Sequence, residues 1–171
     1  MKTFLTLALF IEVFWTYGQT TLDRQVGHIS KEFEKINSSN LSQKTFRYSD
    51  RCGVTMATIT VFSDNDIVRK ITDVGIGDDD KAAASWSYQY YYENGKLIFS
   101  YEKSSGHDLE TGTAYKDEVR EYFVSDRLIM KIKNGQKTYP KSETINTIDT
   151  RYRLMNIKNS SDIKEIYKCL N

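Results

Sequence analysis

Residues 85–103 read SWSYQYYYENGKLIFSYEK, and this stretch decides the fold. At its centre lies Asn94-Gly95, a dipeptide that favours a two-residue β-turn because both positions accept a positive φ. The flanking residues are mainly aromatic and aliphatic, which suits a pleated sheet. The stretch therefore predicts a β-hairpin with strands over 85–92 and 96–103.

The two-residue turn also predicts which residues face one another. Counting back from the turn gives three cross-strand pairs: Tyr92–Leu97, Tyr90–Phe99 and Tyr88–Tyr101. Because alternate side chains point to the same side of a strand, these six residues share one face with Trp86. The opposite face carries mostly polar side chains, so we expect a sheet with one covered, aromatic face.

A similar pattern occurs 31 residues later, where YFVSDRLIM (residues 122–130) matches YYENGKLIF (residues 91–99). Each copy has two consecutive large apolar or aromatic residues, a turn pair, a basic residue and then Leu-Ile. The strands of the second copy are expected over 119–124 and 127–133, and further strand patterns lie at 44–48, 54–62 and 67–74. Because short loops join successive strands, the sequence predicts a single antiparallel meander sheet of five to seven strands.

Two amphipathic stretches flank the strands. Over residues 20–36, apolar residues recur every three or four positions, which is typical of a helix with one buried face. This stripe consists of Leu22, Val26, Ile29, Phe33 and Ile36. Residues 162–170 predict a short C-terminal helix, whereas 144–157 combine helical spacing with β-branched residues and remain undecided. The predicted fold class is α+β, with the N-terminal helix packed on the aromatic face.

Residues 1–18 have the anatomy of a secretory signal peptide, with a positive charge, a short apolar run and cleavage expected between Gly18 and Gln19. The alternative is a membrane anchor, but the run is too short to span a bilayer and Glu12 interrupts it. We therefore expect a secreted or periplasmic protein with a single domain over 19–171. No transmembrane segment is expected in the mature chain.

Export would place both cysteines, Cys52 and Cys169, in an oxidising compartment, where a disulfide between them is expected. It would join the start of the sheet to the C-terminal helix. The alternatives are two separate buried thiols, or a Cys52 nucleophile assisted by a distant histidine.

The charge balance excludes a basic footprint for nucleic acid, since 24 Lys+Arg and 23 Asp+Glu give a net charge of +1. No cofactor-binding motif is present, and no cofactor is expected. The two histidines, His28 and His107, fit a helix surface and a polar loop. Three aspartates in a glycine-containing loop, Asp78, Asp79 and Asp80, are weak candidates for a metal ion, but a solvated hairpin loop is the favoured explanation and no metal site is expected.

The concentration of aromatic residues in the two hairpins is the feature most relevant to function. A tyrosine combines a ring that can stack with a hydroxyl that needs a partner. One interpretation is a platform that stacks on a sugar or a peptide; the favoured one is a core covered by a helix, with the hydroxyls at its rim. Tyr91 and Tyr122, which fall on outer faces in the predicted registers, are the candidate binding residues together with Trp86.

The hairpin motifs over residues 91–99 and 120–129 resemble those of a loosely defined group of small, uncharacterised bacterial secreted proteins. That group combines a signal peptide, a short helix and antiparallel strands. The resemblance implies export and an antiparallel sheet. It implies no activity, because these motifs describe turns and cores.

Together these observations favour an exported, non-enzymatic binding protein of the bacterial envelope or exterior. The partner expected first is another protein, as in inhibitor or immunity modules. The second hypothesis is a glycan or small ligand bound on a tyrosine-rich sheet face, and the third is an enzyme. A shape without a pocket lined by titratable groups would favour a protein partner, whereas a concave, solvent-open aromatic face would favour a ligand.

Overall fold

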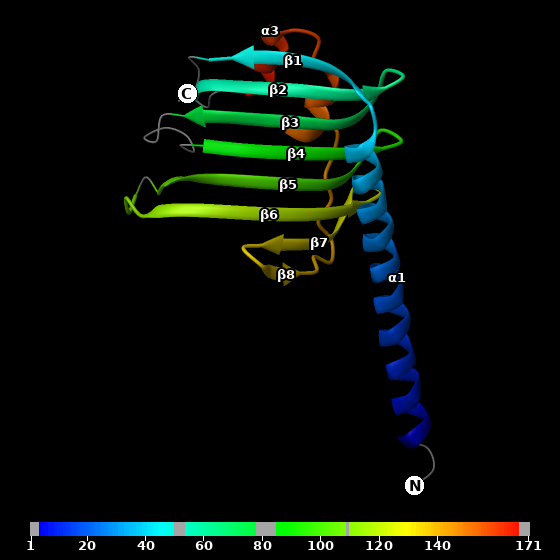
Figure 1. Ribbon diagram of the computed structural model, residues 1–171. Helices are drawn as coiled ribbons and strands as arrows, with labels where there is room; N and C mark the ends of the chain where they lie inside the picture. The colour runs from blue at the N-terminus through cyan, green and yellow to red at the C-terminus, as the bar shows by residue number, and fades with distance from the viewer. Residues whose placement is uncertain (1–3, 50–53, 78–84, 109, 168–171) are drawn as a thin grey trace.

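The computed structural model describes residues 4–49, 54–77, 85–108 and 110–167. A long helix, α1 (Phe4–Ser38), precedes one sheet whose eight strands are neighbours in chain order (Figure 1). The strands are β1 (Ser42–Tyr48), β2 (Val54–Asp64), β3 (Ile67–Gly77), β4 (Ser85–Glu93), β5 (Lys96–His107), β6 (Ala114–Val124), β7 (Arg127–Lys133) and β8 (Gln136–Thr138). The chain then forms α2 (Thr150–Arg153), the 3₁₀ helix η1 (Leu154–Asn156) and α3 (Ser160–Ile166).

The α+β class and the antiparallel meander are confirmed, but the sheet has eight strands rather than five to seven. The additional strand is β8, which follows a second Asn-Gly turn with positive φ at Asn134 (49°) and Gly135 (82°). All three residues of β8 are exposed. A strand this short and polar has no apolar alternation, so only its turn could have predicted it.

The register of the central hairpin matches the prediction only next to the turn. Tyr92 pairs with Leu97, but Tyr91 then pairs with Phe99, because a β-bulge at Ile98 adds one residue to β5. The predicted pairs Tyr90–Phe99 and Tyr88–Tyr101 are therefore wrong by one position. A bulge puts two residues opposite one. From Phe99 onward, each β5 side chain therefore lies on the face opposite to the predicted one.

The same irregularity occurs in three hairpins, at the end of the sheet where α1 crosses it (Figure 1). Each has a turn with two positive-φ residues, and the register shifts just beyond it. The extra residues are Arg69 in β3, Ile98 in β5 and Ile129 in β7. The repeat that the sequence shows twice is therefore a structural unit that occurs three times.

Both faces of the sheet are covered, where one covered face was expected. On one face, Ile29 and Ile36 of α1 form a core with four residues of the strands, Tyr91, Ile98, Phe99 and Ile129. On the other, the C-terminal segment packs on a second core that includes Tyr90, Tyr92 and Leu97. Figure 1 shows α1 in front of the sheet and the C-terminal segment behind it. The predicted single aromatic face is thus divided between two cores.

The helical predictions at the two ends are confirmed in outline. Leu22, Val26 and Phe33 of the predicted stripe pack on the first core, and Ile29 and Ile36 belong to it. Within 144–157, helix is confined to α2 and η1, and α3 ends at Ile166. In the described part of the chain, no helix combines the length and apolarity needed to span a bilayer.

Candidate functional site

The strongest candidate site is a groove between α1 and the strands β5 and β6. Polar contacts fix the helix at the hairpin end of the sheet: Arg69 donates to Glu32 (Nη2–Oε2, 3.2 Å) and Lys70 donates to Asn37 (Nζ–Oδ1, 2.8 Å). His28, predicted on a helix surface, lies 2.9 Å from Glu93 (Nε2–Oε2). These contacts hold α1 across the strands.

The groove has a volume of about 400 Å³, which is within the range of small-molecule sites (roughly 300–1,000 Å³). The helix supplies one wall and the outward-facing residues of two strands supply the other. Its lining consists of Ile29, Ser30, Phe33, Glu34, Phe99, Tyr101, Arg120 and Tyr122.

Aromatic rings form the apolar part of the lining and support one another. The Phe33 ring meets Phe99 edge-on, with centroids 5.5 Å apart and an interplanar angle of 82°. Tyr122 is tilted against Phe99 at 4.9 Å, and Phe33 is tilted against Tyr91 at 4.8 Å. Such edge and tilted contacts are the favoured aromatic geometries, so the rings are held in place before a ligand arrives.

A polar cluster borders the groove on the strand side. Glu118 accepts hydrogen bonds from the Tyr101 hydroxyl (3.1 Å) and from Arg120 Nη2 (2.6 Å), and lies 3.7 Å from Lys103 Nζ. The Arg120 guanidinium and the Lys103 ammonium lie 5.4 and 5.1 Å from the centre of the Tyr101 ring. Burial acts against ionisation of Glu118, but the hydrogen bond from Tyr101 and the charges of Arg120 and Lys103 lower its pKa.

The three predicted binding residues fall in three different environments. Tyr122 is half-buried and lines the groove. Tyr91 lies on the face opposite Tyr90 and Tyr92, as predicted, but α1 covers that face and buries Tyr91 fully. Its hydroxyl lies 2.7 Å from Gln89 Oε1 and 3.2 Å from Asn37 Oδ1. Trp86 is buried on the opposite face, where its Nε1 donates to Asp73 Oδ1 at 3.0 Å. The structure therefore does not bring these residues together.

The remaining predicted sites give no cluster. Asp78, Asp79 and Asp80 lie outside the described residues, and so do Cys52 and Cys169 of the predicted disulfide. His107 is exposed at the end of β5. No group of three or more His, Cys, Asp or Glu side chains that could hold a metal ion occurs within the described ranges.

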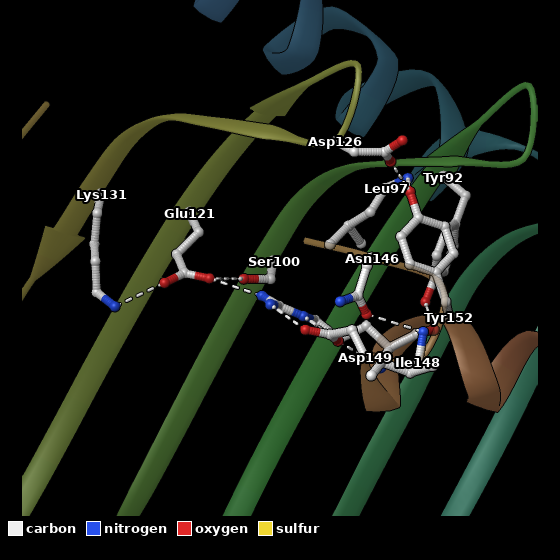
Figure 2. Close-up of polar contacts among 11 residues, drawn as sticks. Tyr92, Leu97, Ser100, Glu121, Asp126, Lys131, Asn146, Ile148, Asp149 and Tyr152 are labelled. Carbon is white, nitrogen blue, oxygen red and sulfur yellow. Dashed lines mark hydrogen bonds and ion pairs between the residues drawn. The ribbon is translucent and has the colours of Figure 1, made fainter. Parts of the chain in front are cut away.

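A second polar cluster lies on the other face of the sheet and is shown in Figure 2. Glu121 is buried there between Arg151 (Nη1–Oε2, 2.8 Å) and Lys131 (Nζ–Oε1, 2.7 Å). Asp149 binds the same guanidinium at 2.8 Å and caps α2 by accepting from the Arg151 N–H. Burial would lower the pKa of Arg151, but the hydrogen bonds and charges of Asp149 and Glu121 raise it.

The same cluster reaches the central hairpin through Tyr152 (Figure 2). The Tyr152 hydroxyl accepts from the Leu97 N–H at 2.9 Å and donates to Asp126, which also binds Lys96. The Tyr92 hydroxyl donates to the Arg151 carbonyl at 2.5 Å. In the part of the chain that the structure describes, every buried side-chain nitrogen and oxygen has a partner. The cluster is therefore saturated internally and attaches the C-terminal segment to the sheet.

Sequence reasoning missed most of the groove. Phe33 was assigned to the core stripe, and Tyr101 was assigned to the covered face because the bulge was not foreseen. Arg120 and Glu118 lie two residues apart on one strand, so they share a face. That alternation predicts that Glu118 and Arg120 lie side by side, but it does not indicate that α1 forms a groove beside them.

Comparison with known proteins adds no assignment: no protein-family model matches the chain, and no curated protein or solved structure matches it significantly.

Proposed function

We propose that this protein is an exported, non-enzymatic binding protein that holds a small amphipathic ligand in the groove between α1, β5 and β6. One observation carries the proposal: a groove of about 400 Å³ combines mutually supported aromatic rings with a charged, hydrogen-bonding border. A few placed polar groups in a mostly apolar lining are the usual composition of small-molecule sites. The groove differs from the cluster of Figure 2 because it is an open cavity between α1 and the strands, whereas the C-terminal segment packs over that cluster.

The location of the groove is compatible with export. The helix side chains that pack on the sheet or line the groove run from Leu22 to Ile36. Cleavage before Gln19 would leave all of them on the mature chain. The proposal of secretion or periplasmic location therefore needs no rearrangement of the groove.

Substitution of Tyr122 tests the proposal. A library of small aromatic and polyhydroxylated compounds would be screened by ligand-observed NMR against the wild-type chain, Tyr122→Ala, Tyr122→Phe and the control Tyr139→Ala. We expect hits that Tyr122→Ala weakens by about tenfold, because a stacking ring is lost, and that Tyr122→Phe retains. Tyr139 is exposed and does not line the groove, so its removal should have no effect. Hits that bind Tyr122→Ala as well as the wild type would contradict the proposal.

A protein partner is the second candidate, and a different surface favours it. Three apolar side chains, Met56, Val74 and Ile76, are about half exposed on β2 and β3, and Met56 pairs directly with Ile76. Adjacent exposed apolar residues are typical of contact surfaces. A photo-cross-linking amino acid at position 76, compared with one at exposed Lys116, would give a defined adduct in envelope extract only at position 76. Equal labelling at both positions would remove this candidate.

A further inference from the structure

We infer that the ligand of the groove is a neutral sugar unit of mono- or disaccharide size. This inference rests on the proposed function, because it names the chemical class of the ligand for the same groove. It is carried by the free ring surface, by the charges of the lining and by the arrangement of hydrogen-bonding groups.

The ring surface left for a ligand belongs to Phe33 and Tyr122. Phe99 is buried between them and serves as their support, with 7% of its surface exposed. Tyr101 already has the cations of Arg120 and Lys103 over its ring, so it orients these side chains and does not offer a stacking face. Two half-buried rings on facing elements suit a flat ligand with C–H groups on its faces, as a sugar ring has.

The charges of the groove balance. The lining contains one cation, Arg120, and one carboxylate, Glu34, and the bordering Glu118 and Lys103 also balance. Arg120 is held by Glu118 at 2.6 Å, so an anionic ligand would compete with that carboxylate and would also meet Glu34. A cationic ligand would meet Arg120 and Lys103. The balance therefore favours a ligand without net charge.

The polar groups alternate between donor and acceptor. On the helix, Glu34 is an acceptor, and the Ser30 hydroxyl donates to the Val26 carbonyl at 2.9 Å, which leaves its oxygen lone pairs for a ligand. On the strand, Arg120 donates through N–H groups that Glu118 does not use. A hydroxyl both donates and accepts, so neighbouring sugar hydroxyls can bond to both walls, whereas a purely apolar ligand would displace water from these groups without replacing its hydrogen bonds.

Calorimetric titration of the full chain tests the inference with neutral and charged sugars of matched size. The neutral probes are methyl glucoside, N-acetylglucosamine and their disaccharides, and the charged probes are glucuronic acid and glucosamine. We expect the neutral sugars to bind most tightly, and Tyr122→Ala or Arg120→Ala to weaken them by about tenfold. Lys116→Ala, an exposed residue of the same strand, is the matched control. Titration with longer oligosaccharides distinguishes the two sources of such a sugar: retained affinity indicates the end of a polysaccharide, and lost affinity indicates a free sugar.

A change in the preference between charged and neutral sugars, caused by removing one charge from the groove, provides a second readout. A variant that is merely destabilised would not show it. Glu34→Gln should improve the affinity for glucuronic acid relative to neutral sugars, and Arg120→Gln should improve that for glucosamine. Tighter binding of a charged sugar than of its neutral counterpart by the wild type would overturn the inference. Binding of aromatic acids in the groove with no binding of neutral sugars would also overturn it, yet would leave the proposed function standing. No binding of any compound in the groove would contradict both.

Discussion

At the scale of single residues, Gly75 and Trp86 show how tightly the two sides of a strand pair constrain each other. Gly75 is buried and pairs with Trp86 across β3 and β4. A Cβ at position 75 would lie 2.2 Å from a carbon of the indole ring. Glycine is therefore required here for space, because the indole ring occupies the place of a side chain.

Gly75→Ala should lower the free energy of unfolding by about 1–3 kcal/mol, because overpacking forces the indole ring out of its position. Urea unfolding measures the effect. Gly27→Ala is the matched control, since an added Cβ there meets nothing within 4 Å and the site lies within α1. In that helix, alanine should be neutral or stabilise by up to about 1 kcal/mol. A Gly75→Ala protein as stable as the wild type would show that the indole ring has room to move.

Asp73 is a buried carboxylate that holds Trp86 and Tyr167, whose hydroxyl donates to it at 2.5 Å. Burial raises its pKa above the usual 3.8, although both hydrogen bonds act in the opposite direction. Burial likewise raises the pKa of Glu102, to which the nearby Glu121 adds. The folded state thus binds these protons more tightly than the unfolded state does, so stability falls as the pH rises through the raised pKa values.

Asp73→Asn should therefore reduce the loss of stability as the pH rises above the usual carboxyl range, because it removes a group whose pKa is raised by burial. Above that range, the lowered pKa values of Asp126 and Asp149 contribute nothing to the slope. The measurement is urea unfolding over a series of pH values above that range. Asp66→Asn, in an exposed turn, is the control and should keep the wild-type slope. An unchanged slope in Asp73→Asn would contradict the assignment.

At the scale of elements, a buried ion pair is one of the contacts that attach the C-terminal segment to the sheet. The side chains of Arg151 and Glu121 are 15% and 10% exposed, and the guanidinium also binds Asp149 beside α2. Removing one partner of a buried pair leaves the other charge without compensation, which is more harmful than replacing both.

Arg151→Met should lower the free energy of unfolding by about 2–4 kcal/mol, because it removes one partner of a buried ion pair. The loss is limited because Lys131 remains as a partner of Glu121. The double substitution Arg151→Met with Glu121→Gln should recover part of this loss. Thermal unfolding compares both with Arg127→Met, an exposed arginine that should have little effect. If the double variant were less stable than Arg151→Met alone, the charge of Glu121 would not be the cause.

Most helices and strands could be predicted from the sequence, but the irregularity in the central hairpin could not. Turn chemistry and strand composition predicted seven of the strands, the meander order and the buried stripe of α1, because each is a local property. The bulge at Ile98 was not predictable, since hydrophobic residues follow Lys96 in either register and only packing under α1 selects one. That single extra residue transfers Phe99 and Tyr101 to the face of the groove.

The candidate site was predictable only for Tyr122. A groove depends on which surface of a helix faces which strands, and residues such as Glu34 and Arg120 are far apart in the chain and carry no local motif. Tyr91 shows the reverse case: the pattern exposes it, and the tertiary packing of α1 buries it completely.

At the scale of the whole molecule, the two faces of the sheet differ in how they are completed. Behind the sheet, α2, η1 and α3 pack on a core whose polar groups satisfy one another. In front, α1 crosses one end of the strands (Figure 1). A groove of about 400 Å³ lies between α1, β5 and β6. This asymmetry supports the proposed ligand site on the α1 face, whereas the opposite face holds the C-terminal segment.

The most direct test of this assignment is a ¹⁵N–¹H chemical-shift map of the full chain titrated with N-acetylglucosamine disaccharide. The largest shifts should fall on Ser30, Glu34, Tyr101, Arg120 and Tyr122, with little change at Arg151 or Tyr152 on the opposite face. Shifts centred on the C-terminal segment, with the groove residues unmoved, would contradict it.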